Sequence, residues 1–372
     1  MKLPEFGVEA WLNKWETKAT YDISQSSIKA LTLEELIGLD GTSVAEFFNN
    51  YAKQPLDYGA IEGSEEFKRL VAQLYQNIKP DSILQTNGAT GGNLLALYAL
   101  VEPGDEVVSM VPSYQQLYDI PKSFGAKVKF VHLQEKNGWQ FNINELKELV
   151  TEKTKMITLN SANNPTGTWI KRKDLEEIVA IARLVDAYVL VDEVYEPLLQ
   201  KEDFVSIADI YEKGIASNSM SKTYSLPGIR IGWTASSLEV ADILRKYRDY
   251  TMICGGVLND ALAIQALKNR RQIILRNQQI IQNNIEIVKN WATTEPKVSL
   301  VLPQNVSTAF IKLEFEEEDY SFFTRLLKKT GVLLIPGAAF GFPKHARLGY
   351  CCDPETLRVG LKKLSSFLHE ND

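Results

Sequence analysis

An alternation of short apolar segments with helix-like segments, from residue 82 to residue 217, most constrains how this chain can fold. Apolar runs predict strands at 83–86, 107–110, 127–131, 156–159, 188–191 and 214–217. The spacing of apolar residues between them predicts helices at 94–100, 115–124 and 173–185. This alternation favours an α/β fold in which helices sandwich a mostly parallel sheet. Such sheets bind ligands at the carboxyl ends of their strands.

The pattern changes after residue 233, where helix-like segments come first and strands return later. Helices are expected at 238–247, 258–267 and 272–291. Beyond them the chain predicts strands at 298–302, 308–313 and 332–335, and helices at 320–329 and 354–368. This order is typical of a smaller α+β unit. We therefore expect an N-terminal arm that packs on the smaller domain, a large domain and a small C-terminal domain, with the bounds 1–40, 41–280 and 281–372.

The overall composition argues against several classes of partner. The 372 residues carry a formal net charge of -6. Lysine and arginine form no stripe, so nucleic acid and anionic membranes are poor candidate partners. The N-terminus lacks the apolar segment of a signal peptide. The three cysteines, Cys254, Cys351 and Cys352, have neither a disulfide pattern nor zinc-ligand spacing. We expect a cytoplasmic protein without a bound metal.

Two polar segments follow predicted strands and are candidates for ligand contacts. Residues 87–92, N-G-A-T-G-G, are expected to form a glycine-rich loop before a helix, where free backbone N–H groups favour an anion. The spacing matches neither a dinucleotide-binding nor a Walker motif, and many such loops are only turns. Residues 160–167, N-S-A-N-N-P-T-G, also suit a turn. Their position at a strand end makes Asn164 a candidate hydrogen-bond donor.

A lysine in an unusual setting is the strongest functional signal. Lys222 lies among hydroxyl-bearing residues, and Arg230 follows eight positions later, in S-N-S-M-S-K-T-Y-S-L-P-G-I-R-I-G-W. A lysine amine near a carbonyl group forms a Schiff base, and hydroxyls with an arginine suit a phosphate. Asp192 ends a predicted buried strand and needs a partner there: a helix end, a salt bridge or a protonated pyridine nitrogen. Together these residues suggest pyridoxal phosphate (PLP) as the cofactor.

These stretches together resemble the fold-type I PLP enzymes, in particular the class I and II aminotransferases related to aspartate aminotransferase. The resemblance covers nearly the whole chain in the family's order, and the pattern S-x-S-K-x-x-x-x-x-G-x-R-x-G at 219–232 is highly specific. It implies the PLP-dependent transferase fold of type I. It also implies an enzyme that moves an amino group between an amino acid and a 2-oxo acid through an aldimine with Lys222 and through pyridoxamine phosphate.

The same resemblance implies a role for each candidate residue. Lys222 would hold the cofactor and move protons, and Asp192 would face the pyridine nitrogen. Asn164 and Tyr195 would bond the phenolic oxygen of the ring, and Tyr114 would stack on the ring. The phosphate would be held by Gly88, Ala89, Thr90, Ser219 and Arg230. Ala89 stands where many relatives have a serine, so at this position only the backbone could contact the phosphate.

Several arginines compete for the substrate carboxylate. Arg347, in H-A-R-L-G-Y, matches the carboxylate-binding arginine of the family, and its planar fork suits bidentate binding. Asn164 is expected to contact the substrate beside it. Arg358 and Arg248 are expected on solvated helix faces. No arginine within 251–259 resembles the residue that binds a second carboxylate in aspartate-specific enzymes, so dicarboxylate specificity is unsupported.

Two stretches near the N-terminus bear on assembly and on the outcome of the reaction. Tyr58 resembles the family tyrosine that reaches the cofactor phosphate of the neighbouring subunit, which implies a homodimer with shared sites. The stretch from E-A-W-L-N-K-W through Y-D-I-S-Q-S-S-I-K-A-L-T-L-E-E-L is similar to capreomycidine synthase, a family member that cyclises a hydroxylated arginine. A PLP-dependent lyase or cyclase, of the capreomycidine synthase or C–S lyase type, is therefore the alternative function. A PLP-binding transcriptional regulator is disfavoured because we find no basic DNA-binding extension.

Overall fold

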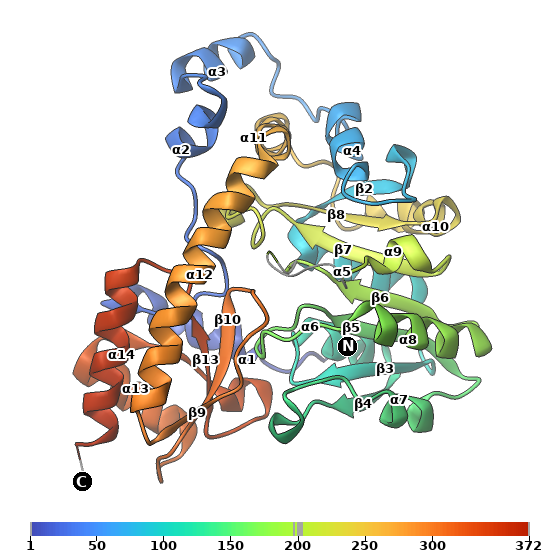
Figure 1. Cartoon of the computed structure of the whole chain (residues 1–372). Coiled ribbons are helices and arrows are strands. Elements are labelled where there is room, and N and C mark those ends of the chain that lie inside the picture. The colour runs from blue at the N-terminus through green and yellow to red at the C-terminus, as the bar shows by residue number, and fades with distance from the viewer. Residues whose placement is uncertain (1, 196–197, 199–203, 371–372) are drawn as a thin grey trace.

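Two sheets and one long helix organise the molecule. The computed structural model describes residues 2–195, 198 and 204–370. A seven-stranded sheet and a four-stranded sheet lie in separate units, and α12 (Arg270–Thr294) runs along the smaller unit toward the larger one (Figure 1). The described helices have no apolar stretch of membrane-spanning length.

The larger sheet carries the alternating part of the chain. Its strands in spatial order are β2 (Ile83–Asn87), β8 (Ile231–Ser236), β7 (Gly214–Ser219), β6 (Tyr188–Asp192), β5 (Thr154–Asn160), β3 (Glu106–Val111) and β4 (Lys127–His132). β8 runs antiparallel to both of its neighbours, and the other described pairings are parallel. The prediction of an α/β fold with a mostly parallel sheet is confirmed.

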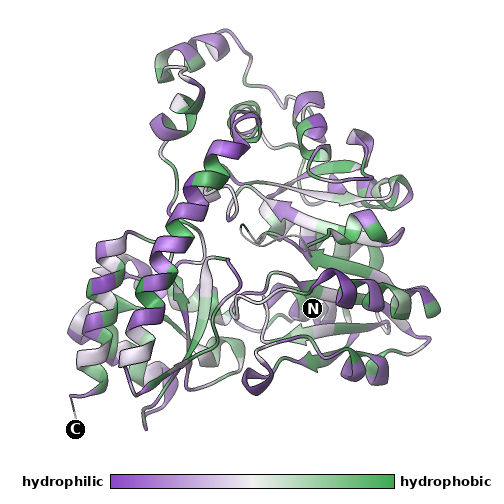
Figure 2. Cartoon of the chain, viewed as in Figure 1, coloured by the Kyte–Doolittle hydropathy of each residue, from purple (hydrophilic) through white to green (hydrophobic). Residues whose placement is uncertain are grey.

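Helices cover both faces of this sheet, as the two-sided burial of β6 requires. Val189 and Val191 pack into the core on the side of α8 (Arg172–Leu184) and α9 (Ile207–Ile210). Leu190 points the other way and packs with residues of α5 (Gly88–Leu100), α6 (Gln116–Phe124) and α10 (Leu238–Arg248). Figure 2 shows β6 largely in the hydrophobic colour and hydrophilic residues along α8 and α12. Strands buried on both faces read as continuous apolar runs.

One predicted element was wrong, and several helices and strands of the structure were not predicted. Residues 88–92 are not a loop, because α5 begins directly at Gly88 and these residues form its first turns. β8 was not predicted. All six of its residues are buried, and Gly232, Thr234 and Ser236 interrupt the apolar run that identified the other buried strands. The short helices α3 (Val44–Tyr51) and α7 (Ile143–Leu149) were also missed. The flanking helices α2 (Leu33–Ile37), α4 (Glu65–Ala72) and α11 (Val257–Lys268) complete this part of the chain.

The smaller unit is built on an antiparallel sheet. Its strands in spatial order are β12 (Ile335–Pro336), β13 (His345–Gly349), β10 (Thr308–Leu313) and β9 (Val298–Leu300). α13 (Asp319–Thr330) and α14 (Pro354–Leu368) belong to the same unit (Figure 1). The predicted strand at 332–335 is split into β11 (Val332–Leu333) and β12. β13 was not predicted, and it is another strand with every residue buried.

The N-terminal arm is attached to the smaller unit by backbone pairing. β1 (Tyr21–Asp22) pairs in parallel with β11, and α1 (Gly7–Trp15) precedes it. Trp11 Nε1 donates a hydrogen bond of 2.9 Å to the carbonyl of Leu334. The backbone N–H of Gly349 donates to Ile23 O at 2.9 Å. A Cβ at Gly349 would lie 1.7 Å from Gln25 O, so a side chain at this position would displace the arm.

Candidate active site

Most of the predicted site residues line one cavity of about 280 Å³. It lies where β5, β6 and β7 end, so the carboxyl edge of the larger sheet forms its floor. The smaller sheet contributes Arg347, and the arm contributes side chains that the sequence analysis did not select: Glu9, Leu12, Glu16, Gln25 and Ser26. The predicted residues that line the cavity are Ala89, Thr90, Tyr114, Asn164, Asp192, Tyr195, Ser219, Lys222, Arg230 and Arg347.

Asp192 is a buried carboxylate with uncharged hydrogen-bond partners. It is the last residue of β6 and is 3% exposed. Asn93 Nδ2 donates to Oδ2 at 2.7 Å, and the backbone N–H of Val194 donates to Oδ1 at 3.2 Å. Burial raises the pKa of Asp192 to about 6, and the hydrogen bond from Asn93 opposes this rise. A carboxylate in such a setting fits a cationic ring nitrogen, which would supply the missing positive charge.

Lys222 lies one turn beyond the end of β7 and faces the same cavity as Asp192. Its Nζ is 2.7 Å from Ser26 Oγ and 5.7 Å from the centre of the Tyr195 ring. Burial, together with the nearby charge of Arg347, lowers the pKa of Lys222 to about 8. The amine can therefore lose and regain a proton near neutral pH, as a group in acid–base catalysis must.

The first turn of α5 and the segment after Lys222 form an anion cradle. The chain passes from β2 into α5 at Gly88, which has a positive φ of 65°. A Cβ there would lie 2.7 Å from Arg230 Nη2, so this position requires glycine. The N–H groups of a first helical turn have no partner within the helix and attract an anion. Arg230 Nη1 lies 3.5 Å from Ser221 Oγ, so Ser221 joins the predicted phosphate-binding residues at this cradle.

Two tyrosines border the space between Asp192 and Lys222. Burial raises the pKa of Tyr114 to about 12 and raises that of Tyr195 further. Both phenols are therefore protonated at neutral pH and can donate hydrogen bonds. The hydroxyl of Ser26, on the N-terminal arm, opposes the rise in the pKa of Tyr195.

Arg347 reaches the cavity from the central part of β13. It is 2% exposed, and its Nε and Nη2 donate to Ser24 O at 3.3 and 2.9 Å. Nη1 donates to Asn164 Oδ1 at 3.2 Å. These bonds fix the plane of the guanidinium group, as bidentate binding of a carboxylate requires. They also occupy the amide oxygen of Asn164, which leaves its NH₂ group as a donor.

Tyr58 is not brought to the cavity of its own chain. Its side chain is 68% exposed, and it lines a second pocket together with Gly59, Val257 and Asp260. A contact of Tyr58 with a cofactor phosphate would therefore involve the site of another subunit. Arg358, predicted to be solvated, is exposed.

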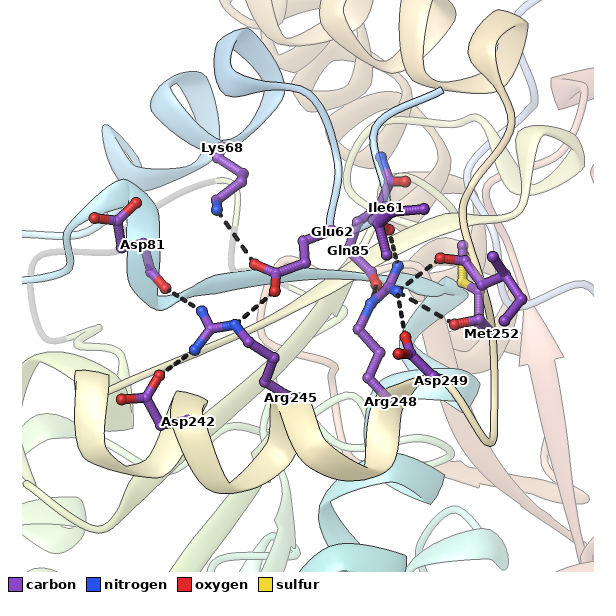
Figure 3. A network of polar contacts seen from close by, with 11 residues as sticks. Ile61, Glu62, Lys68, Asp81, Gln85, Asp242, Arg245, Arg248, Asp249 and Met252 are labelled. Carbon is purple, nitrogen blue, oxygen red and sulfur yellow. Dashed lines mark hydrogen bonds and ion pairs between the residues drawn. The ribbon is translucent and has the colours of Figure 1, made fainter. Parts of the chain in front are cut away.

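The prediction that Arg248 lies on a solvated face was wrong. Arg248 is 1% exposed and donates to the carbonyls of Gln85 (2.9 Å), Met252 (3.2 Å), Ile253 (2.9 Å) and Ile61 (Figure 3). These bonds connect β2 with the segment before α4 and with the segment after α10. Arg245, one turn earlier on α10, instead forms ion pairs with Glu62 and Asp242. The periodicity of α10 could not reveal the burial of Arg248, because the chain after α10 folds back over this arginine.

Other residues at the site were missed for different reasons. Asn93 is a polar residue in an otherwise apolar helix segment, and this signal could have identified it. Ser26 has no such signal, since its neighbours are serines and a glutamine. Glu193, directly after Asp192 in the chain, accepts hydrogen bonds from Ser206 Oγ and Ile207 N at the start of α9.

Comparison with known proteins places the chain in a family. Residues 44–364 match the family described as aminotransferase class I and II. The chain belongs to this family. An aspartate aminotransferase of Thermotoga maritima is 31% identical over 308 residues, which are 81% of this chain and 79% of the relative. A crystal structure of a PLP-dependent aminotransferase from Streptococcus suis is 52% identical, with a TM-score of 0.97 over 100% of this chain and 99% of that chain.

The aminotransferase also resembles an enzyme with a different outcome. Capreomycidine synthase of Streptomyces vinaceus is 26% identical over 98% of this chain and 94% of its own length. The predicted likeness of the arm to this enzyme is therefore confirmed and extends along the chain. The family match and the relatives named aminotransferases give transamination more support than cyclisation. The protein is a PLP-dependent aminotransferase, as the sequence predicted.

Proposed function

We propose that the aminotransferase exchanges an amino group between an amino acid and a 2-oxo acid at the cavity that Lys222, Asp192 and Arg347 line. The observation that carries this proposal is the placement of these three groups around one cavity at the carboxyl edge of the larger sheet. Bound PLP supplies the carbonyl group that takes up the amine and an electron-withdrawing ring. The protein groups supply proton transfer, charge and orientation.

Each of the three groups has a distinct role in this proposal. Lys222 removes the proton from the α-carbon of the amino acid and returns a proton, and a pKa of about 8 lets the amine act in both directions. Asp192 stabilises the protonated ring nitrogen by its negative charge. Arg347 holds the α-carboxylate, because its guanidinium plane is already fixed by Ser24 and Asn164.

The remaining contacts orient the cofactor. Asn164 and Tyr195 would donate to the phenolic oxygen, and Tyr114 would stack on the ring. The phosphate would lie at the first turn of α5, held by Gly88, Ala89, Thr90, Ser219, Ser221 and Arg230. At Ala89 the contact is a backbone N–H, since alanine has no side-chain donor.

We also propose a homodimer in which Tyr58 completes the phosphate site of the partner subunit. Large apolar side chains near Tyr58 are exposed in the single chain: Leu56 at 79%, Ile61 at 43%, Tyr250 at 80% and Ile253 at 46%. Exposed apolar residues in one region are typical of a covered interface. Amino acids and 2-oxo acids would enter from the side of the arm, which lines the cavity with Glu9 and Glu16.

The division into an arm (1–40), a large domain (41–280) and a small domain (281–372) remains a proposal. Its support is the separation of the two sheets and the pairing of β1 with β11. The boundary at 280 lies within α12, so that this helix would belong to both domains. We propose a cytoplasmic location, because all three cysteines are free.

A screen of amino acids against the purified holoenzyme tests the proposed function. An amino donor should change the absorbance of the bound cofactor and leave its own 2-oxo acid, and a second 2-oxo acid should reverse the change. Lys222→Ala should abolish turnover, whereas Lys213→Ala, on the protein surface, should not. Full activity of Lys222→Ala would refute the proposal. Release of ammonia or a cyclised product without any amino transfer would favour the lyase or cyclase alternative instead.

A further inference from the structure

The hydroxyl group of Ser26 contacts the amine of Lys222. Ser26 is 9% exposed, and its Oγ lies 2.7 Å from Lys222 Nζ, although 196 positions separate the two residues. We propose that Ser26 is a positioning residue that orients and stabilises the amine of Lys222 for proton transfer. The inference rests on the proposed role of Lys222 as the group that carries the proton.

The backbone around Ser26 is held on both sides, so its hydroxyl has a fixed position. Ser307 Oγ donates to Ser26 O at 2.5 Å. Three residues earlier, Ile23 O accepts from the N–H of Gly349 at 2.9 Å. Gln25 O packs so closely against Gly349 that a Cβ added to this glycine would lie 1.7 Å from Gln25 O. The arm is therefore clamped to the smaller unit at the point where Ser26 meets Lys222.

A fixed hydroxyl can control where the lone pair of a neutral amine points. When Ser26 Oγ accepts one N–H of Lys222, rotation about the Cε–Nζ bond is restricted, and the lone pair takes a defined direction. The lone pair then receives the proton of the α-carbon, and the resulting ammonium group keeps its hydrogen bond to Ser26. Ser26 retains its own proton throughout, so Lys222 alone carries the transferred proton.

Charged groups face Lys222 from several elements, but Ser26 is the contact at hydrogen-bond distance. Arg347 and Arg230 disfavour the ammonium form, and Glu9 and Asp192 favour it. These four charges include two of each sign, so they oppose one another at the amine. The ring of Tyr195 lies 5.7 Å from Nζ. Ser26 Oγ is a neutral acceptor in direct contact with Nζ. Its hydrogen bond therefore stabilises the ammonium form of Lys222 separately from these charges.

Titration of Lys222 in the full-length apoprotein measures this effect without using turnover. With lysine labelled at the ε-carbon with ¹³C, NMR should show that Ser26→Ala binds the Lys222 proton about tenfold more weakly, as expected when a hydrogen bond to a charged group is lost. In the holoenzyme, the same variant should lower kcat about tenfold and move its pH profile toward lower pH. The KM for the amino acid should change little, because Arg347 is intact.

Two further variants separate positioning from a structural effect. Ser26→Thr keeps a hydroxyl and should restore the wild-type titration. Ser225 lies three positions after Lys222, and its buried hydroxyl contacts Asn277 at 3.2 Å. Ser225→Ala removes this hydroxyl and should leave the titration of Lys222 unchanged. If Ser26→Ala does not fold, Ser26→Cys replaces it as a variant with a weak hydrogen-bonding group.

The outcomes distinguish this inference from the proposed function. A wild-type titration of Lys222 in Ser26→Ala, or an equal change in Ser225→Ala, would overturn the role of Ser26. If Lys222→Ala is inactive while Ser26→Ala behaves as the wild type, only the inference about Ser26 fails. If Lys222→Ala remains active, the proposed function itself fails.

Discussion

Arg347 and Asn164 are joined by a hydrogen bond of 3.2 Å between Nη1 and Oδ1, although they come from different units of the molecule. Arg347 lies on β13 of the smaller sheet, and Asn164 follows β5 of the larger one. The arginine that would hold the substrate carboxylate and the amide that would hold the cofactor thus contact each other directly. Their geometry depends on how the two units pack together.

Replacement of Arg347 by lysine tests the importance of the fixed guanidinium plane. A lysine keeps the charge but cannot bind a carboxylate with two parallel hydrogen bonds. We expect Arg347→Lys to lower kcat/KM for the amino donor about 100-fold, which corresponds to roughly 3 kcal/mol for charge-assisted hydrogen bonds. Steady-state kinetics measure this change. Arg358→Lys, on the exposed face of α14, is the control, and an equal loss there would contradict the assignment.

Replacement of Asp192 by asparagine should affect activity and apoprotein stability in opposite directions. Loss of the charge opposite the ring nitrogen should reduce kcat roughly 100- to 1000-fold, as for removal of one partner of a buried charge pair. The folded apoprotein binds the Asp192 proton more tightly than the unfolded chain, because burial raises this pKa from 3.8 to about 6. The carboxylate therefore destabilises the fold increasingly as the pH rises from about 4 to 6, and fully above 6.

The stability part of this prediction is measured by thermal unfolding of the apoprotein. At pH 8, Asp192→Asn should unfold at a higher temperature than the wild type, with a difference on the order of 3 kcal/mol or less. This difference should vanish near pH 4. Asp186→Asn, which changes an exposed surface carboxylate, should show no such pH dependence. A lower stability of Asp192→Asn at pH 8 would show that the carboxylate stabilises the apoprotein.

The buried Arg248 should matter for folding much more than its neighbour on the same helix. Arg248→Met leaves four carbonyl groups without their donor, and each unsatisfied buried group costs about 1 kcal/mol or more. We expect a loss of about 3–5 kcal/mol in the free energy of unfolding. Arg245→Met removes partly exposed ion pairs and should cost about 1 kcal/mol or less. Denaturant titration compares the two, and similar losses would refute the difference.

Glu9 should influence which side chains the site accepts. It lines the cavity, and its negative charge acts on Lys222 and Arg347. An acidic substrate side chain would be repelled, so Glu9→Gln should raise kcat/KM for aspartate a few-fold relative to alanine, in line with about 1 kcal/mol for an exposed charge. Glu5→Gln, on the same arm but outside the cavity lining, should leave this ratio unchanged. An unchanged ratio in Glu9→Gln would exclude this electrostatic role.

The proposed contribution of Tyr58 can be tested with mixed dimers. Tyr58→Ala should bind PLP more weakly, because a hydrogen bond to the phosphate is lost in each site. Lys222→Ala subunits retain Tyr58 and can complete the site of a Tyr58→Ala partner. At a PLP concentration that leaves Tyr58→Ala dimers largely without cofactor, mixing the two variants should therefore restore about a quarter of the wild-type activity, since about half the dimers are mixed and each has one complete site. No recovery would argue against sites shared between subunits.

Much of the fold could be predicted from local patterns. The parallel strands β3, β4, β5, β6 and β7 were recognised because buried strands appear as short apolar runs between helices. β8 and β13 were missed because their neighbours in space, not in sequence, determine that they are strands. The start of α5 at Gly88 was also missed, since three glycines within its first five residues oppose helix formation until packing against the sheet favours it.

The sequence by itself identified Lys222, Asp192 and Arg230 as candidate site residues, because each lies in a strand end or motif whose residues are near one another along the chain. Only the tertiary structure decided that Ser26 contacts Lys222, that Asn164 contacts Arg347 and that Arg248 is buried. These contacts join residues that are far apart in sequence. A hydrogen bond depends on positions within a few tenths of an ångström, and the packing of distant segments sets those positions.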